Sequence, residues 1–172
     1  MTILWVILAI LCLIVLAGIV MGLLGSRIPE EHVAHASVHL KQSPQTVWDL
    51  VADAPGHATW ADSVTKVEKV ADRDGHPAWR QTMGPNSFVL VTIESQPPTR
   101  LVRSIQDDKM FSGRWEYDIK PDGDGCTVTI TEYGRVPNAM ARFMMQFFDP
   151  ALYAKKHLRS LAKKFGETAE VR

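Results

Sequence analysis

The hydrophobic pattern divides the chain into two parts. Ile3 to Leu24 is a run of 22 residues without a charged or strongly polar side chain, and the 148 residues after it mix polar and apolar positions. At ~1.5 Å of rise per residue, a helix over this run is roughly 33 Å long, enough to cross a hydrocarbon core of about 30 Å. We therefore expect a transmembrane anchor over residues 1–25, a short linker over 26–31, one domain over 32–168 and a tail over 169–172.

A cleaved signal peptide is the competing interpretation of the apolar run. Such a peptide has a basic amino-terminal region, an apolar core of about 7–15 residues and a small-x-small cleavage site close behind it. Here only Met1 and Thr2 precede the run, and the one Ala-x-Ala sequence, Ala34 to Ala36, lies well beyond its end. The pattern favours an uncleaved anchor, which predicts a single-pass protein of a bacterial inner membrane.

Two weaker signals concern orientation and self-association. No Lys or Arg precedes the run whereas Arg27 follows it, so the count of basic residues nominally places the domain in the cytoplasm. Gly18 and Gly22 have the GxxxG spacing that lets two transmembrane helices approach closely. This spacing is compatible with a homodimer and equally with the general abundance of glycine in such helices.

The domain begins with a strand and two short helices. Residues 34–41 alternate between apolar and polar side chains, as a half-buried strand does. Ser43 then supplies a helix N-cap and Pro44 the first helical position, and apolar residues follow at helical spacing to Val51. The segment from Asp53 to His57 ends this helix, and one further turn carrying Trp60 is expected.

After Asp62 the sequence predicts an antiparallel meander followed by a helical segment. Strand-like runs alternate with Gly, Pro, Asp and Asn turn signals, one of them at residues 107–109. Helical periodicity with one apolar stripe extends from Asn138 to Phe165, and Asp149-Pro150 predicts either a kink or a short helix followed by a longer one capped by Asp149. The five or six expected strands are Val64–Ala71, Ala78–Met83, Phe88–Glu94, Leu101–Gln106, Phe111–Lys120 and Cys126–Arg135.

Composition and motifs exclude several classes of function. The 19 basic and 19 acidic residues all lie outside the apolar run, so the domain is formally neutral, and no nucleic-acid partner is expected. No nucleophile elbow, phosphate-binding loop or dinucleotide fingerprint occurs in the sequence, and no cofactor is predicted. His35 and His39 would stand about 13 Å apart on one strand face, with His32 on the other, so no metal site is expected.

The order of these elements and the residues on them resemble the helix-grip superfamily (SRPBCC). This superfamily includes START lipid-transfer domains, birch-allergen-like proteins and bacterial polyketide cyclase/dehydrase-like proteins. The resemblance covers roughly residues 31–166. The motifs that carry it are Ser43-Pro-Gln-Thr-Val-Trp48-Asp-Leu-Val, Asp53-Ala-Pro-Gly-His-Ala-Thr-Trp60, Gly113-Arg-Trp115-Glu-Tyr117 and Gly125-Cys-Thr-Val-Thr-Ile-Thr-Glu132-Tyr-Gly134.

The resemblance implies an α+β fold. A curved antiparallel sheet of six to seven strands would wrap around a long C-terminal helix, with two short helices after the first strand and the transmembrane helix in front. It also implies an apolar cavity between sheet and helix that binds a hydrophobic small molecule or lipid. The resemblance does not by itself imply catalysis, because the cyclases of this superfamily lack a shared catalytic motif.

Strand parity then names the residues expected to face such a cavity. Methionine and phenylalanine in the first half of the last helical segment suit either a packed core or an adaptable ligand contact. The predicted ligand-binding residues are Trp60, Phe111, Trp115, Tyr117, Val128, Ile130, Glu132, Met140, Phe143, Met144 and Phe147.

Three of the polar residues are weak candidates for acid–base chemistry. An inward-facing Glu132 would orient a ligand or act as a base, unless the strand end is solvated or Glu132 pairs with Arg80 or Arg103. His57 is a proton carrier if it lies in a cleft, and an ordinary surface residue if its loop is exposed. Tyr117 is the third candidate.

Three hypotheses of function follow. The first is membrane-tethered binding of a hydrophobic molecule, such as a lipid or a quinone from the adjacent bilayer, driven by burial at ~25 cal/mol per Å². The second is a cyclase/dehydrase-type enzyme, which requires at least two polar groups converging inside the cavity. The third is an interaction module of a membrane complex, which a filled cavity and an exposed apolar patch would favour.

Overall fold

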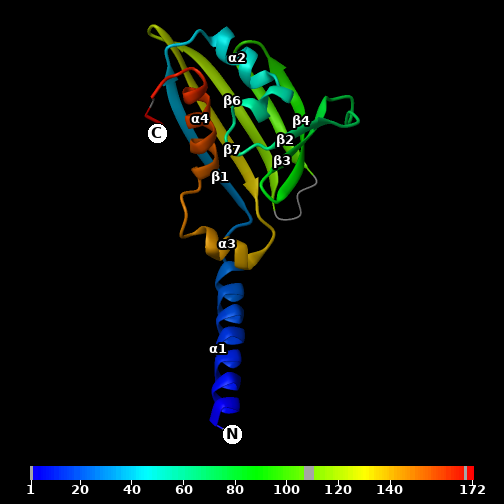
Figure 1. Ribbon diagram of the computed structural model, residues 1–172, viewed down its shortest axis with the longest axis vertical. Coiled ribbons are helices and arrows are strands. Elements are labelled where there is room, and N and C mark those ends of the chain that lie inside the picture. The colour runs from blue at the N-terminus through cyan, green and yellow to red at the C-terminus, as the bar shows by residue number, and fades with distance from the viewer. Residues whose placement is uncertain (1, 107–110, 169) are drawn as a thin grey trace.

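The apolar run forms one long helix that projects from the domain. The computed structural model describes residues 2–106, 111–168 and 170–172, so the turn predicted at 107–109 lies outside the described residues. Helix α1 (Thr2–Gly25) extends away from the rest of the chain (Figure 1). Its length and composition are those of a membrane-crossing helix, and a signal sequence would have the same properties.

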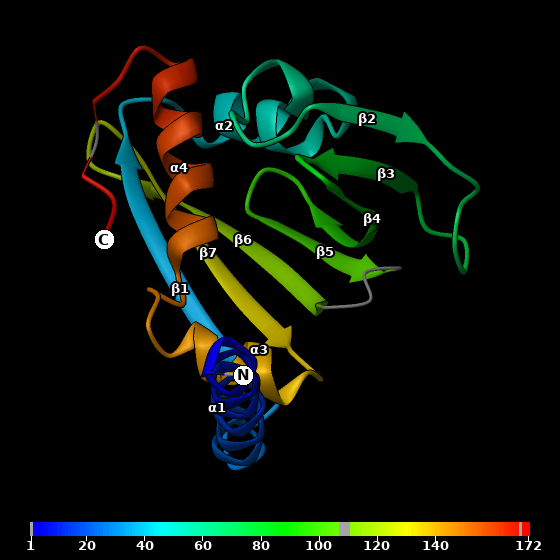
Figure 2. The same ribbon diagram turned by 60° about the horizontal axis from the view of Figure 1, so that its bottom comes forward.

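The rest of the chain is a seven-stranded antiparallel sheet that curves around a C-terminal helix (Figure 2). The order in the sheet is β1-β7-β6-β5-β4-β3-β2, so the first and last strands are neighbours. This arrangement confirms the α+β helix-grip fold. The strands are β1 (Glu31–Leu40), β2 (Lys66–Lys69), β3 (Ala78–Met83), β4 (Asn86–Gln96), β5 (Arg100–Gln106), β6 (Ser112–Asp122) and β7 (Gly125–Arg135).

Of the two short helices between β1 and β2, the first forms where the local sequence predicts it, and the second lies slightly earlier than expected and ends just before Trp60. Helix α2 (Pro44–Ala52) is capped by Ser43, whose Oγ accepts a hydrogen bond from the amide of Thr46 at 3.1 Å. The 3₁₀ turn η1 (Pro55–Thr59) follows directly, with proline in its first turn. This connection carries the chain from β1, at one edge of the sheet, to β2, at the other.

Alternation along the strands decides which side chains enter the core. In β1 the residues Ala34, Ala36, Val38 and Leu40 are buried as predicted. The pairing of β6 with β7 sets Tyr117 opposite Ile130 and Ile119 opposite Val128, and all four are buried. These residues belong to the same hydrophobic core as Leu158 and Leu161 of the C-terminal helix.

The C-terminal segment forms two separate helices, α3 (Ala139–Met145) and α4 (Leu152–Lys164). The prediction that the whole segment carries one continuous apolar stripe is therefore wrong, and the alternative of a short and a longer helix is confirmed. Proline 150 has no amide hydrogen to continue the first helix, and the Asp149 carboxylate accepts from the Ala151 amide at 2.9 Å. Helix α4 packs in the concave face of the sheet, whereas α3 packs against α1.

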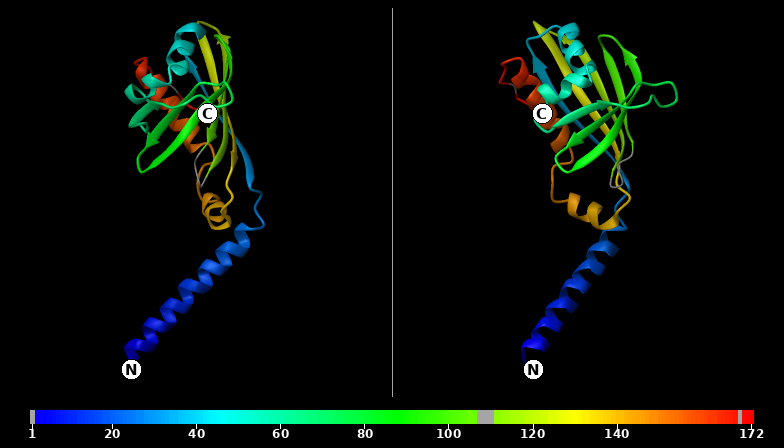
Figure 3. Two further views of the ribbon diagram at one scale, coloured as in Figure 1. Left: turned by 90° about the vertical axis from the view of Figure 1, so that its right-hand side faces the viewer. Right: turned by 45° about the vertical axis from the view of Figure 1, so that its right-hand side comes forward.

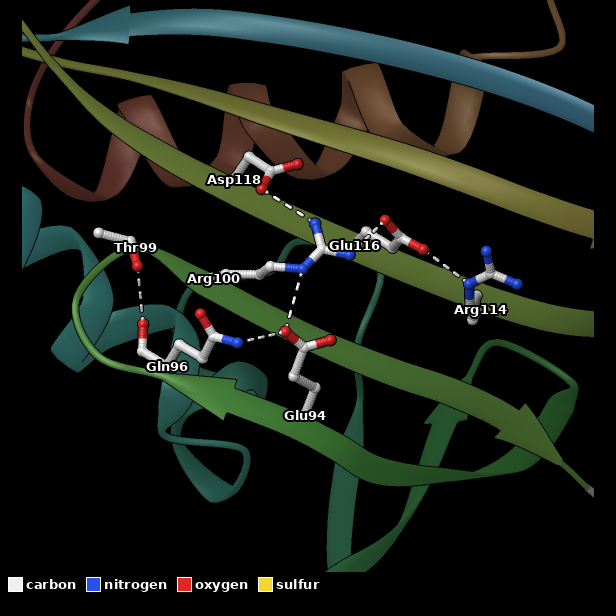
Figure 4. A network of polar contacts seen from close by, with 7 residues as sticks. All are labelled: Glu94, Gln96, Thr99, Arg100, Arg114, Glu116 and Asp118. Atoms are coloured by element: carbon white, nitrogen blue, oxygen red, sulfur yellow. Dashed lines mark hydrogen bonds and ion pairs between the residues drawn. The ribbon is translucent and has the colours of Figure 1, made fainter.

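The convex face of the sheet carries charge pairs (Figure 4). Arg100 on β5 lies 3.1 Å from Glu94, 2.7 Å from Glu116 and 3.0 Å from Asp118. Its hydrogen bonds to Glu116 and Asp118 raise the pKa of Arg100. These side chains point away from α4, because they alternate with the inward-facing residues of the same strands.

Candidate functional site

Five side chains from four elements meet between α4 and the concave face of the sheet. We call them the buried polar cluster: His57 of η1, Trp60 just after it, Arg103 of β5, Tyr117 of β6 and His157 of α4. Each is at most 7% exposed. Polar side chains are normally excluded from the core of a small domain, so their convergence at one place calls for a chemical explanation.

The local sequence explains how each residue reaches the cluster. Arg103 and Tyr117 have inward parity on β5 and β6, like Leu101, which pairs with Tyr117. His157 lies one turn after Ala154 on the buried side of α4. The η1 turn holds the His57 and Trp60 rings edge to face with centroids 5.1 Å apart.

Arg103 fixes the protonation of the His57 ring. Its Nη1 lies 3.1 Å from Nε2 of His57, and its Nη2 donates to the carbonyl of Ala52 at 2.9 Å. Because a guanidinium only donates hydrogen bonds, Nε2 must accept, which leaves the ring proton on Nδ1. The carbonyl of Val51, also 3.1 Å from Nε2, then receives no hydrogen bond from this ring.

Burial keeps the cluster neutral except at Arg103. Burial and the nearby Arg103 charge lower the pKa of His57 to about 4, and burial holds the pKa of His157 well below its usual range. Burial also raises the pKa of Tyr117 to about 12. No carboxylate among the described residues pairs with Arg103, whose own pKa burial lowers. The Asp53 carboxylate attracts this guanidinium from a distance without an ion pair, so the cluster contains a buried cation beside two neutral imidazoles.

His157 lies inside a ring of aromatic side chains. Its Nε2 is 3.2 Å from the Tyr117 hydroxyl, which is protonated at neutral pH and donates this hydrogen bond. The centroids of Trp60 and Trp115 lie 4.8 and 5.5 Å from that of His157, both edge to face. Such packing holds the imidazole in place and keeps water from it.

Three buried polar atoms around His57 have no hydrogen-bond partner among the described residues. They are Nδ1 of His57, Nε1 of Trp60 and Oε1 of Gln81. An unpaired buried polar atom costs about 1–3 kcal/mol. The Gln81 side chain lies within hydrogen-bonding reach of the His57 ring and raises the pKa of His57, so these two side chains can satisfy each other, and Nε1 of Trp60 is the donor left for another partner.

A pocket of about 360 Å³ opens next to the cluster, between η1 and the C-terminal half of α4. Trp60 belongs to both features, since it lines the pocket and its ring contacts His157. An ion pair between Lys163 and Asp62, at 3.2 Å, lies at the pocket as well. The remaining lining residues are Ala58, Thr59, Ala61, Val64, Ser160 and Lys164.

The structure brings some of the predicted site residues together and separates others. Trp60, Trp115 and Tyr117 surround His157, and Val128 and Ile130 are packed in the adjoining core. Phe111 lies instead near His32, with ring centroids 6.0 Å apart. The four residues from the last helical segment lie on α3 and the turn after it, next to α1 and away from the cluster; these are Met140, Phe143, Met144 and Phe147.

Glu132 faces inward as strand parity predicts, but its partners differ from those expected. Arg80 and Arg103 do not pair with it. Its carboxylate accepts from Nε1 of Trp115 at 2.5 Å and lies 3.1 Å from Nε2 of His32. The β6–β7 register sets Trp115 directly opposite Glu132, which explains why the indole of Trp115 is a hydrogen-bond partner of this carboxylate.

Two histidines of the cluster are buried although the sequence pattern did not identify them as buried residues. The interpretation of His57 as an exposed loop residue is wrong, because its side chain is 1% exposed. His157 was not singled out, although it falls at helical spacing among Ala154, Leu158 and Leu161 on the apolar stripe. This spacing within the apolar stripe was the sequence signal that could have identified His157 as a buried residue.

Comparisons with known proteins agree with this architecture. The family model described as polyketide cyclase / dehydrase and lipid transport matches residues 31–166. A search of curated protein sequences found no significant match.

Solved structures share the fold at low sequence identity. An aromatase/cyclase from a Streptomyces species matches with a TM-score of 0.65 at 11% identity, covering 78% of this chain and 93% of that one. A START superfamily protein from Mycobacterium smegmatis matches with a TM-score of 0.58 at 17% identity, covering 78% and 94%. A truncated norcoclaurine synthase from Thalictrum flavum matches with a TM-score of 0.60 at 13% identity, covering 80% and 95%.

Proposed function

We propose that this chain, which belongs to the polyketide cyclase/dehydrase and lipid-transport family, binds a hydrophobic or amphipathic small molecule at the buried polar cluster while α1 holds it at a membrane. The observation that carries the proposal is the group of buried polar atoms around His57, among which Nε1 of Trp60 has no partner among the described residues. Buried polar atoms are nearly always paired, and a ligand that pairs them recovers their desolvation cost.

The chemistry of these atoms suggests what the ligand presents. Nδ1 of His57 and Nε1 of Trp60 are donors that suit a carbonyl or hydroxyl oxygen, and Oε1 of Gln81 accepts from a hydroxyl. The unpaired Arg103 cation favours electron-rich oxygen nearby. Aromatic walls would contribute affinity at ~25 cal/mol per Å² of apolar surface removed from water. A lipid or quinone with oxygens at one end of an apolar body meets these conditions.

The pocket beside Trp60 is the entry route in this proposal. It opens to the surface on one side, and the Trp60 ring separates it from His157 on the other. A rotation of that one side chain would join the pocket to the polar cluster.

The junction between α1 and the domain supports an anchor over a cleaved signal sequence. Gly25, the last residue of α1, is buried, and its carbonyl accepts a hydrogen bond from Nε of Arg142 at 3.1 Å. The Arg142 side chain is 7% exposed. Removal of α1 would leave this buried guanidinium with one donor unsatisfied, so the domain is built to keep the helix.

An enzymatic function is the second candidate, because polar groups converge as such an activity requires. A protonated Tyr117 hydroxyl 3.2 Å from a neutral His157 is a competent proton-relay pair. In this version Arg103 stabilises developing negative charge on the ligand and His57 orients it. Glu132, held by Trp115 and His32, would position the aromatic wall and take no part in proton transfer.

Native mass spectrometry of the full chain in lipid nanodiscs tests both candidates. The protein is incubated with a panel of phospholipids and quinones, and we expect a retained small molecule of unchanged mass for a carrier and of changed mass for an enzyme. The decisive variant is Gln81→Leu, which removes a buried acceptor beside His57 and should therefore bind less ligand than wild type.

Arg100→Met on the convex face is the matched control and should retain wild-type occupancy, since Arg100 points away from the cluster. If the wild-type chain retained no member of the panel, or Gln81→Leu bound as well as wild type, the proposed site would be wrong.

A further inference from the structure

The segment from Ala139 to Phe148 exposes apolar surface at the junction with α1. We call its exposed members the α3 patch: Met140, Met144, Met145, Phe147 and Phe148. Phe147 is 70% exposed and Phe148 is 60% exposed, which is unusual for two adjacent aromatic side chains in water.

No charged side chain interrupts this patch. Arg142 is the one charged residue of the segment, and its guanidinium points inward, where it donates to the carbonyls of Gly25, Val136 and Pro137 at 3.1, 2.9 and 2.7 Å. Glu30 lies 3.5 Å from the same group. The segment can therefore enter an apolar medium without exposing a charge to it.

The α3 patch lies beside the apolar run of α1. A Cβ on Gly25 would come within 1.8 Å of the Ala139 carbonyl oxygen, and a Cβ on Gly18 would lie 3.9 Å from Cε of Met140. Gly18 is about 10 Å along the helix from Gly25, at ~1.5 Å per residue. Helix α3 thus runs across the end of α1 (Figures 1 and 3). The Met140 side chain reaches back along the last two turns of α1.

We infer that the α3 patch is immersed in the lipid leaflet that surrounds the C-terminal end of α1. This inference rests on the proposed function, in which α1 spans the membrane. Surface-bound amphipathic segments bury their apolar face about 5–10 Å into the boundary between head groups and acyl chains. The reach of Met140 back to Gly18 places the patch at this depth if the bilayer ends near Arg27, the first charged residue after α1.

A second membrane contact determines how the domain stands on the bilayer. One helix followed by a short linker would leave the domain free to tilt and rotate. Arg142 and the close packing of Gly25 under Ala139 join α3 to α1, so both enter the lipid as one unit. The end of the sheet that leads into α3 then faces the bilayer, with β7 and α4 rising from it (Figure 1).

Depth-dependent fluorescence quenching of the full chain tests this inference. The background is Cys12→Ala, and Cys126, which is fully buried, is left in place. A polarity-sensitive nitrobenzoxadiazole (NBD) probe is attached to Phe147→Cys, to Leu13→Cys in the middle of α1, or to Asp124→Cys in the turn between β6 and β7. Each protein is reconstituted into phosphatidylcholine vesicles that carry nitroxide groups at a shallow or a deep position.

We expect strong quenching by shallow nitroxides at position 147, strong quenching by deep nitroxides at position 13, and quenching at least several-fold weaker at position 124. If position 13 is quenched while position 147 behaves like position 124, the patch inference is overturned and the anchor stands. If position 13 is not quenched, both the anchor and the inference are overturned. A probe at 147 that resists aqueous iodide and lipid nitroxides alike would show a protein contact and would also overturn the inference.

Discussion

Mild acid should destabilise this protein because two imidazoles are buried in neutral form. The pKa of His57 is about 4 in the folded chain, against an ordinary value near 6.5 in an unfolded one. Between these values the unfolded state binds a proton that the folded state does not. Stability is therefore complete above about pH 6.5 and declines as the pH falls toward 4.

The size of the effect follows from the same two values. Lowering the pH from 7.5 to 5.0 should cost about 2 kcal/mol through His57 alone, by proton linkage. Burial holds the pKa of His157 well below its usual range, so His157 should add to the loss in the same direction. The loss through His57 alone is already a sizeable part of the 5–15 kcal/mol that stabilises a typical domain.

Urea unfolding of the full chain in detergent micelles, followed by tryptophan fluorescence, measures this loss. Trp60 and Trp115 lie against His157, so their emission reports on the cluster directly. With a urea slope of about 2 kcal/mol per M, His57 alone should lower the midpoint by about 1 M between pH 7.5 and 5.0, and His157 should lower it further.

Two variants separate the buried histidines from every other titrating group. His157→Phe retains an aromatic ring but cannot titrate, so it should lose part of the pH dependence whatever its absolute stability. His35→Gln, on the exposed face of β1, should retain all of it. If His157→Phe and wild type showed the same change in midpoint between the two pH values, burial of a neutral His157 would be disproved.

Three further predictions concern other contacts. The Tyr117 phenol should ionise near pH 12 in an ultraviolet titration, and Tyr117→Phe should remove that late phase; its persistence would contradict the assignment. Gly25→Ala should destabilise the junction of α1 with α3 by about 1–3 kcal/mol and speed proteolysis there, whereas Gly22→Ala, with open space around it, should not. Glu132→Leu should lower the unfolding free energy by about 1–3 kcal/mol because the Trp115 indole loses its acceptor, whereas Glu132→Gln should cost less; equal losses would count against this bond.

Much of the fold was predictable because its signals are local. Alternation at Ala34, Ala36, Val38 and Leu40 fixes the buried face of β1 through strand geometry alone. A Ser-Pro pair caps α2, and proline 150 ends the helical segment before α4, since each effect depends on neighbours in the sequence. Only the prediction of one apolar stripe over both helices failed, because periodicity does not report which surface a helix packs against.

The candidate site was less accessible to sequence reasoning. Tyr117 and Trp60 were predicted to line it, but Arg103 was considered only as a partner for Glu132, and His157 was overlooked within an otherwise apolar stripe. The contacts that define the cluster join residues 46 and 40 positions apart, His57 to Arg103 and Tyr117 to His157. Such pairs depend on how four elements are arranged in space, which no local pattern encodes.

By itself the sequence determined a long apolar helix, a meander of strands and the faces that those strands bury, because backbone geometry makes each of these a matter of spacing. Only the tertiary structure decided that His57 is buried and neutral, that Arg103 points at it without an ion-paired carboxylate, and that α3 packs against α1 while methionines and phenylalanines of this segment stay exposed. The physical reason is the same in each case. Burial, charge compensation and exposure are properties of the space around a side chain, and that space is filled by residues far away in the chain.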